Sequence, residues 1–178
     1  TVAVVGATGM VGRTMLEVLE KRNFPVARLI PIASEKSVGS TVKFNGESVE
    51  IVSIQYALNI DIDVALFSAG GEISQEWAPR FAEKGIVVID NSSAFRMAEG
   101  HKLIIPEING DALGNDDMII ANPNCSTMQL LMALKPLHDN YKIIRGVVST
   151  YQSVTGTGAA AVNQLDSERR GEDSQKVY

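Results

Sequence analysis

The single cysteine of this 178-residue chain, Cys125, lies in the segment ANPNCSTMQLL. An Asn-Pro-Asn turn precedes it, and an apolar run with helical spacing follows, so we expect the thiol in the first turn of a helix capped by Asn124 or Ser126. The start of a helix offers unpaired N–H groups and partial positive charge, which favour a thiolate nucleophile. The same N–H groups can stabilise an oxyanion on an attacked carbonyl. The alternative is a small, buried and inert cysteine.

A second candidate site is the glycine loop VVGATGMVG, which places Gly6, Gly9 and Gly12 after a short apolar run. In a dinucleotide-binding loop the first glycine permits a tight turn, the second lets the backbone approach a pyrophosphate, and the third lets helix and strand pack closely. The strand-loop-helix context favours such a site, with phosphate at the helix N-terminus. The alternative is a purely structural turn.

The segment ASEKSVGS follows the second expected strand, near the position of an adenosine ribose. NAD-binding proteins usually place Asp or Glu there, whereas Ser34, Lys36 and Ser37 can hydrogen-bond and neutralise a 2′-phosphate. Glu35 can point the opposite way in an extended turn. The segment favours NADP over NAD, and the alternative is that Lys36 is an ordinary surface lysine.

A nucleophilic cysteine beside a nicotinamide cofactor suits aldehyde oxidation. The thiolate adds to the aldehyde, a hydride leaves to the cofactor, and a thioester remains. The acyl group then passes to water, phosphate or another acceptor, and the reverse reaction reduces an acyl phosphate.

The elements that must position these groups alternate along the chain. We expect strands at 2–5, 27–34, 62–71, 86–91, 103–109, 118–122 and 143–154 and helices at 11–21, 73–82, 126–137 and 156–170. An antiparallel hairpin is expected around Asn45-Gly46. Alternating strands and helices predict an α/β fold with a parallel sheet covered on both faces. The polar end after residue 168 suggests that the protein continues beyond residue 178.

Composition excludes several function classes. The net charge is -5 with charges scattered, so no basic surface for nucleic acid or an acidic membrane is expected. There is no apolar run of roughly 18 residues, no signal-peptide pattern and no metal-ligand set. One cysteine cannot form an internal disulfide, which suits a cytoplasmic protein.

The chain resembles the aspartate-β-semialdehyde dehydrogenase family along its whole length. The likeness is carried by VAVVGATGMVG, LFSAGG, VVIDNSSAFRM, PEIN, ANPNCST and STYQSVTGTG. The resemblance implies a doubly wound Rossmann-type NADP-binding domain at 1–124 and, at 125–178, the beginning of a mixed α/β catalytic and dimerisation domain. It also implies NADP-dependent, phosphate-linked interconversion of L-aspartate 4-semialdehyde and L-4-aspartyl phosphate, a step of lysine, threonine and methionine synthesis. A homodimer or homotetramer is expected.

The resemblance also implies residue roles. Cys125 matches the family's thioester nucleophile, Gln152 the glutamine that orients substrate, and Arg96 the arginine that binds phosphate, with Asn124 beside the nucleophile. The implied cofactor contacts are Gly6, Thr8, Gly9, Met10, Val11, Lys36, Ser37, Ser68, Gly70, Thr155 and Gly156. The family's arginine for the 2′-phosphate appears here as Lys36, which keeps the charge but loses the fork geometry.

Two family residues have no counterpart in this chain. The acid/base histidine and the arginine that grips the substrate carboxylate come from a segment beyond residue 178, and neither His101 nor His138 lies in the histidine motif. We therefore expect these 178 residues alone to bind NADP but to catalyse poorly or not at all.

The sequence raises three alternatives. An N-acetyl-γ-glutamyl-phosphate reductase would use the same chemistry, although NSSAFRM and TYQSVTGTG favour the first family. A short-chain reductase needs Tyr followed four residues later by Lys, and Tyr56, Tyr141 and Tyr151 are not so followed. A truncated, non-catalytic NADP-binding module remains open.

Overall fold

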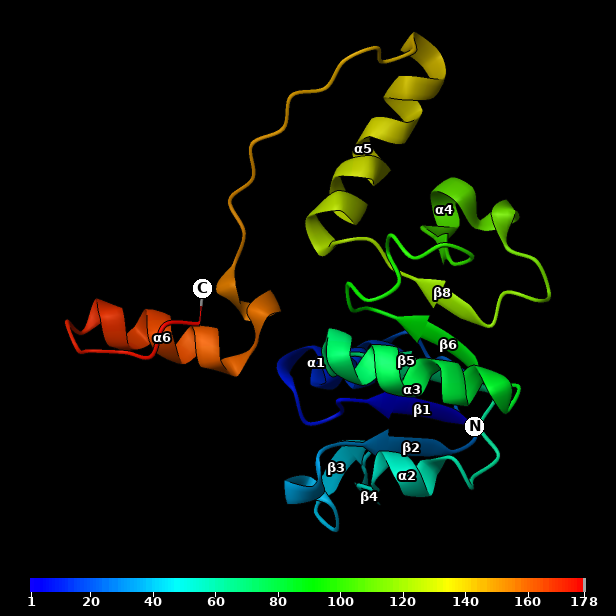
Figure 1. Cartoon of the computed structure of the whole chain (residues 1–178), viewed down its shortest axis with the longest axis vertical. Helices are drawn as coiled ribbons and strands as arrows, with labels where there is room; N and C mark the ends of the chain where they lie inside the picture. The colour runs from blue at the N-terminus through cyan, green and yellow to red at the C-terminus, as the bar shows by residue number, and fades with distance from the viewer. Residues whose placement is uncertain (178) are drawn as a thin grey trace.

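The computed structural model describes residues 1–177, and its centre is a six-stranded parallel sheet (Figure 1). The strand order is β2 (Leu29–Ile32), β1 (Val2–Val5), β5 (Val64–Phe67), β6 (Val87–Asp90), β8 (Ile119–Ala121) and β7 (Lys102–Leu103). The predicted doubly wound α/β fold is confirmed. The apolar runs form buried strands because their side chains are covered on both faces of the sheet.

The chain reverses its winding direction at β1. From β1 it first crosses to β2 and later returns to β5 on the other side of β1. In open parallel sheets, ligands bind outside the carboxyl ends of the strands at such a switch point. Gly6 and Ser68 directly follow β1 and β5, so the glycine loop lies where a dinucleotide is expected.

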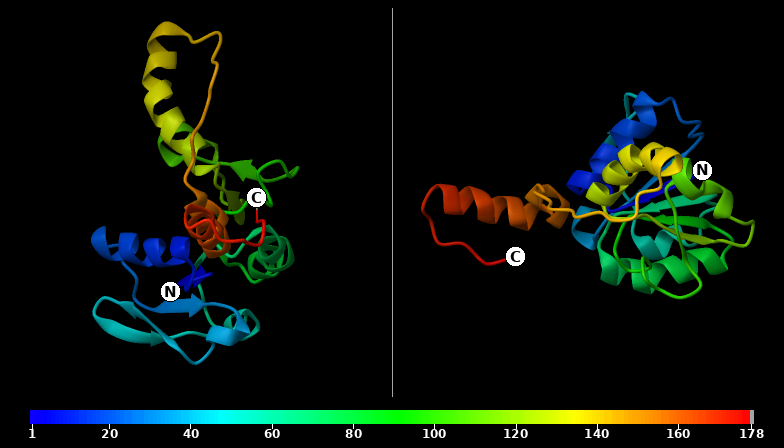
Figure 2. Two further views of the ribbon diagram at one scale, coloured as in Figure 1. Left: turned by 90° about the vertical axis from the view of Figure 1, so that its left-hand side faces the viewer. Right: turned by 90° about the horizontal axis from the view of Figure 1, so that it is seen from above.

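Helices cover the two faces separately (Figure 2, right). On one face, α2 (Ile54–Ala57) and α3 (Gly71–Glu83) pack over Val5, Phe67 and Val88, with Phe81 of α3 edge-on to Phe67 at 5.3 Å between ring centroids. On the other face, α1 (Met10–Lys21) contributes Leu16 to a smaller cluster.

The predicted hairpin is confirmed as β3 (Thr41–Phe44) paired with β4 (Glu47–Glu50). Asn45 and Gly46 both have positive φ, 48° and 80°, as a type I′ turn requires. Phe44 joins the core cluster beneath α1, so the hairpin covers that helix face.

Most expected helices are confirmed, with adjusted bounds. α5 begins at Cys125 and runs to Tyr141, past Pro136, while α6 spans Ala159–Arg169. Short 3₁₀ turns η1, η2 and η3 span Glu35–Ser37, Gly110–Ala112 and Val154–Thr157. Among residues 1–177, no helix is long and apolar enough to cross a membrane.

Two strand predictions were wrong. The segment 103–109 forms only the end of β7 and then helix α4 (Pro106–Asn109), because Pro106 preorganises a first helical turn. The segment 143–153 runs as an extended chain away from the sheet, with Ile144 99% exposed (Figure 1). Its β-forming residues have no neighbouring strand here to complete a hydrogen-bonded ladder.

Candidate active site

The glycine loop has the geometry that its spacing predicts. Gly6 has φ 88°, and a Cβ at this position would lie 2.5 Å from the Ser68 carbonyl oxygen. A Cβ at Gly12 would lie 2.1 Å from the Gly6 carbonyl oxygen, so only glycine lets α1 approach β1 this closely. Gly9 precedes α1 as its N-cap residue, and a Cβ at this position would lie 3.3 Å from the Gly6 carbonyl oxygen.

These features fit a dinucleotide. The first turn of α1, which begins at Met10 and Val11, points unpaired N–H groups outward. Gly9 presents no side chain that would hinder a phosphate, and Arg13 donates to the Thr8 carbonyl oxygen at 3.1 Å, which ties the loop to the helix. A pyrophosphate would meet backbone donors and the positive end of α1 here.

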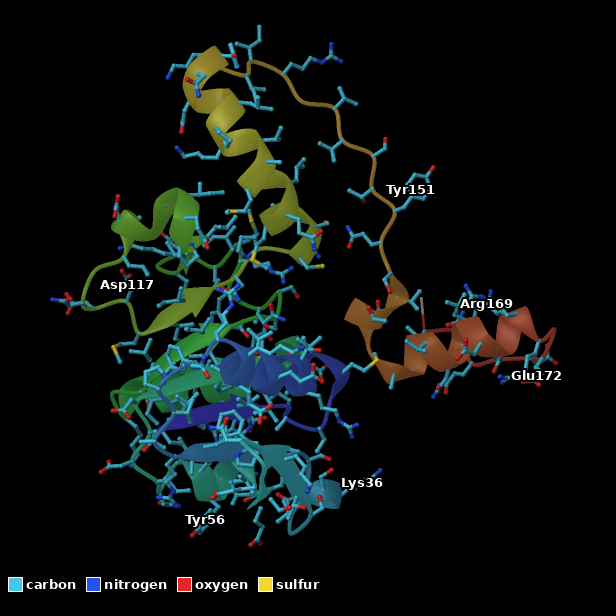
Figure 3. The ribbon with its side chains drawn as sticks, turned by 180° about the vertical axis from the view of Figure 1, so that it is seen from behind. Lys36, Tyr56, Asp117, Tyr151, Arg169 and Glu172 are labelled. Carbon is cyan, nitrogen blue, oxygen red and sulfur yellow. The ribbon has the colours of Figure 1, made fainter. Side chains whose placement is uncertain are left out.

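The other cofactor candidates lie around the same edge of the sheet. Ser68 and Gly70 connect β5 to α3, and Gly70 has φ 95°. Lys36 and Ser37 lie in η1, just after β2, and Figure 3 shows Lys36 on the outer surface. A lysine there is free to approach a phosphate on the ribose side of a bound dinucleotide.

Thr155 and Gly156 lie in η3, away from the sheet. Thr155 hydrogen-bonds within its own turn, where its backbone N–H donates to Ser153 Oγ at 3.3 Å. The structure thus does not bring these two residues to the glycine loop through any hydrogen bond found among residues 1–177.

Cys125 is exposed and is the first residue of α5, as the sequence predicts. Asn124 is the N-cap: its side-chain oxygen accepts from the Ser126 backbone N–H at 3.1 Å and from the Ser126 hydroxyl at 2.6 Å. Cys125 Sγ lies 4.0 Å from the same Asn124 oxygen. An accessible sulfur therefore sits among the free N–H groups of a capped helix start.

Gln152 approaches the nucleophile from the distant segment 143–153. Its Nε2 donates to Ser126 Oγ at 2.9 Å, which places the amide one residue from Cys125. The sequence predicts a glutamine within a strand, whereas the structure shows it exposed and outside regular structure. The reason is the unpaired segment described above, which leaves Gln152 held by side-chain contacts alone.

Arg96 lies in the loop that follows β6. Its Nε donates to the Asn122 carbonyl oxygen at 2.8 Å and its NH2 donates to the Asn91 carbonyl oxygen at 3.2 Å. Asn122 follows β8 and leads through Pro123 to the Cys125 helix. The guanidinium thus bridges the ends of two adjacent strands beside the segment that carries the nucleophile.

Sequence reasoning missed Asp90, the last residue of β6. Its side chain is fully buried, 0% exposed, and accepts hydrogen bonds from the Ser74 and Ser92 hydroxyls, both at 2.7 Å. An acidic residue that ends an apolar strand and precedes two serines was the available signal.

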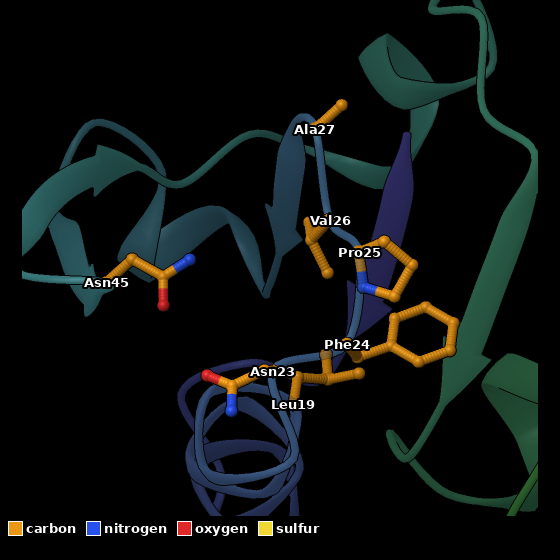
Figure 4. Close-up of a pocket in the computed structure, with 7 residues that line it drawn as sticks. All are labelled: Leu19, Asn23, Phe24, Pro25, Val26, Ala27 and Asn45. Carbon is orange, nitrogen blue, oxygen red and sulfur yellow. The ribbon is translucent and has the colours of Figure 1, made fainter.

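One surface hollow lies elsewhere. A shallow cavity of about 430 Å³ is lined by Leu19, Asn23, Phe24, Pro25, Val26, Ala27 and Asn45 (Figure 4). These residues precede β2 or belong to the hairpin turn, at the amino end of the sheet. The lining contains no titratable side chain, so we assign no chemistry to this cavity.

The Cys125 helix and the glycine loop share the carboxyl edge of the sheet. β1 and β8 are separated by β5 and β6, which places their ends about 14 Å apart at the usual strand spacing. A dinucleotide is an extended ligand, so one bound at the glycine loop can reach across β5 and β6 toward Cys125.

Comparison with known proteins agrees with this geometry. Residues 1–116 match the family model described as the NAD-binding domain of semialdehyde dehydrogenase. The aspartate-semialdehyde dehydrogenase of Shewanella violacea is 52% identical over 166 residues, which cover 92% of this chain and 49% of that protein. The chain spans about half the length of the curated relatives it matches.

Solved structures give the same result. The crystal structure of aspartate semialdehyde dehydrogenase II from Vibrio cholerae matches with a TM-score of 0.89 and 46% identity, over 100% of this chain and 55% of that one. The same enzyme complexed with ASA matches with a TM-score of 0.88 and 46% identity, over 99% and 55%. Neither of the alternative reductases is favoured by these matches. The chain belongs to the semialdehyde dehydrogenase family, and its residues 1–116 form the NAD-binding domain of that family.

Proposed function

We propose that the full-length protein is an aspartate-semialdehyde dehydrogenase that interconverts L-aspartate 4-semialdehyde and L-4-aspartyl phosphate with NADP, in the biosynthesis of lysine, threonine and methionine. One observation carries the proposal: after the NAD-binding domain, the exposed Cys125 opens α5, the Gln152 amide is bonded to the neighbouring Ser126, and Arg96 is bonded to the Asn122 carbonyl three residues before Cys125. The names of the relatives, and the ASA complex of the Vibrio cholerae enzyme, support the choice of substrate.

The proposed reaction begins at Cys125. The thiolate forms a bond to the aldehyde carbon, and the N–H groups at the start of α5 stabilise the resulting oxyanion. When bound, the nicotinamide accepts the hydride that this carbon loses. The carbonyl re-forms as a thioester on Cys125. Phosphate then attacks the thioester, the C–S bond breaks, and the acyl phosphate leaves.

Neighbouring groups orient these steps. Gln152 is held by Ser126, so its amide faces the position of an acyl group on Cys125 and can hydrogen-bond the substrate. Arg96 uses one N–H group for the Asn122 carbonyl and one for the Asn91 carbonyl. Its remaining guanidinium N–H groups can bind the incoming phosphate. Asn124 fixes the first turn that carries the nucleophile.

We also propose the cofactor contacts. Backbone groups of Gly6, Thr8, Gly9, Met10 and Val11 hold the pyrophosphate, and Ser68 and Gly70 line the nicotinamide side. Lys36 and Ser37 bind the 2′-phosphate. Thr155 and Gly156, in η3, are proposed as further cofactor contacts from the family resemblance alone.

The remaining proposals concern the rest of the protein. The acid/base histidine and the arginine for the substrate carboxylate come from beyond residue 178. Residues 1–124 form the dinucleotide domain, and residue 125 opens the catalytic and dimerisation domain of a cytoplasmic homodimer or homotetramer. We therefore expect residues 1–178 alone to turn over poorly.

The test is phosphate-dependent reduction of NADP by the full-length protein with aspartate semialdehyde, compared with Cys125→Ser. We expect turnover to fall by at least about a thousandfold in the serine variant while NADP binding is unchanged. Met132→Leu, a conservative change at an exposed position on the same helix, is the control and retains activity. Near-normal turnover of Cys125→Ser would show that the thioester mechanism is wrong.

A further inference from the structure

Asp90 is a buried carboxylate that the proposed chemistry does not use. Ser74 donates to Oδ1 at 2.7 Å, while the Ser92 backbone N–H donates to Oδ1 at 3.1 Å and its hydroxyl donates to Oδ2 at 2.7 Å. The ion pairs found among residues 1–177 do not include Asp90. A buried carboxylate is costly unless it is hydrogen-bonded, so these three bonds hold Asp90 and its partners in a defined geometry.

The bonds of Asp90 connect two parts of the site. Ser74 lies in the first turns of α3, which follows Ser68 and Gly70, and the positive end of this helix favours a negative charge beside it. Ser92 lies in the loop after β6. Asp90 therefore ties the N-terminal part of α3 to the loop that carries Arg96.

Ser92 connects Asp90 to the part of the loop that leads to Arg96. Its hydroxyl, which donates to Asp90, also accepts from the Ala94 backbone N–H at 3.0 Å. This pair of bonds closes a compact turn. The next residue, Phe95, is buried in the core. The Arg96 guanidinium then donates hydrogen bonds to the Asn91 and Asn122 carbonyl oxygens. Only five residues separate Asp90 from Arg96, and Ser92, Ala94 and Phe95 among them are held by these hydrogen bonds or by burial.

We propose that Asp90 is a positioning residue: through Ser92 it holds the 91–96 loop so that Arg96 faces the phosphate that attacks the acyl group on Cys125. This inference rests on the proposed function, because it presumes that Arg96 binds phosphate. It assigns to a buried acid an effect on phosphate affinity, although the acid touches neither phosphate nor cofactor.

The experiment measures KM for phosphate and kcat separately in the full-length protein. We expect Asp90→Asn and Ser92→Ala to raise the phosphate KM between about tenfold and a hundredfold, because a small displacement of Arg96 spoils its geometry. Asp90→Asn replaces one acceptor by a donor and leaves the Ser92 hydroxyl without its acceptor. Ser92→Thr keeps the hydroxyl and retains a near-normal KM, so that a raised KM in Ser92→Ala is assigned to the loss of the hydroxyl.

Val88→Ala is the matched structural control. Val88 lies two residues before Asp90 on the same face of β6 and is also fully buried, so its truncation lowers thermal stability without touching the loop. We expect it to leave the phosphate KM unchanged. If Val88→Ala raised this KM as much as Asp90→Asn at equal loss of stability, the positioning role would be wrong.

A double-mutant cycle with Arg96→Ala separates the two proposals. If Asp90 acts through Arg96, then Asp90→Asn raises the phosphate KM in the wild-type background but has little further effect after Arg96→Ala. If Asp90→Asn raised the phosphate KM by the same factor with and without Arg96→Ala, the positioning role would be wrong, while the phosphate role of Arg96 would stand. A normal phosphate KM in Arg96→Ala alone would overturn the phosphate role itself.

Discussion

Gln152 donates a hydrogen bond from its side-chain amide to the hydroxyl of Ser126 at 2.9 Å, across 26 residues of sequence. Among residues 1–177 it is the one side-chain hydrogen bond that joins the segment 142–177 to the sheet domain and α5. Ser126 in turn donates to Asn124, so three polar side chains form a chain around Cys125. These bonds connect the N-cap of α5 to Gln152 beside Cys125, the proposed nucleophile.

The first prediction concerns the hydrogen bonds that join Gln152, Ser126 and Asn124. In the full-length protein, Gln152→Ala removes the amide that we propose orients the substrate, and we expect kcat to fall about a hundredfold because that orientation is lost. Gln129→Ala, on the exposed surface of the same α5, is the matched control and retains wild-type kcat. A steady-state assay at saturating substrate measures the effect. An unchanged kcat in Gln152→Ala would contradict the role.

The second prediction concerns the cap. Asn124→Ala removes the acceptor of the Ser126 N–H, and we expect the free energy of unfolding to fall by about 1 kcal/mol and kcat to fall as the first turn frays. Asn140→Ala, near the other end of α5, loses only a bond to the Pro136 carbonyl and leaves kcat unchanged. Urea unfolding and turnover are measured on the same preparations. Equal kcat values in the two variants would argue against the cap's role.

Features with local causes were predictable from the sequence. Asn45 and Gly46 form their turn because both residues tolerate positive φ, and the hairpin needs only its own residues to form. The glycine loop and the start of α5 are equally local, since spacing and capping residues determine them.

Features with distant partners were not predictable. The segment 143–153 has strand-forming residues, but a strand needs a neighbour, which sequence alone does not supply. Asp90 looked like an ordinary strand end because its partner Ser74 comes from a helix 16 residues earlier. The bridge from Arg96 to the Asn122 carbonyl likewise depends on the order of β6 and β8 in the sheet.

The third prediction compares the glycines. Gly12→Ala places a methyl group 2.1 Å from the Gly6 carbonyl oxygen, and because backbone cannot move aside cheaply, we expect about 3 kcal/mol or more of lost stability. Gly110→Ala is the control, since its Cβ would meet only Pro106 at 3.9 Å and its φ is −56°. Thermal and urea unfolding of the full-length variants test this. Wild-type stability in Gly12→Ala would contradict the close approach of α1 and β1.

The fourth prediction concerns cofactor choice. Lys36→Glu replaces a positive charge after β2 by a carboxylate, which repels a 2′-phosphate but accepts a hydrogen bond from a 2′-hydroxyl. We expect the affinity for NADP to fall at least about tenfold relative to NAD. Lys43→Glu, on the hairpin strand β3, makes the same charge change away from this position and leaves the preference unchanged. Isothermal titration calorimetry with both nucleotides measures these affinities. Equal affinity of the wild type for NADP and NAD would contradict the proposal that Lys36 binds the 2′-phosphate.

The fifth prediction concerns pH and the loop before β8. Asp117 accepts from the Lys102 ammonium at 2.7 Å and from the Gly114 backbone N–H at 2.6 Å. The hydrogen bond from Lys102, followed by that from Gly114, holds the pKa of this carboxyl below its ordinary value of 3.8. A lowered folded-state pKa means that the stabilisation is fully present above 3.8 and is lost as the pH falls through the folded-state value.

Asp117→Asn should therefore destabilise the protein near neutral pH and do so progressively less once the pH falls below about 4. Its neighbour Asp116 is exposed and accepts neither bond, so Asp116→Asn is the control and has little effect at either pH. Urea midpoints of the wild type and both variants, measured from about pH 7 down to about pH 3, test whether the stability difference shrinks toward acid. A difference between wild type and Asp117→Asn that grew toward acid would show that the carboxylate does not stabilise this loop.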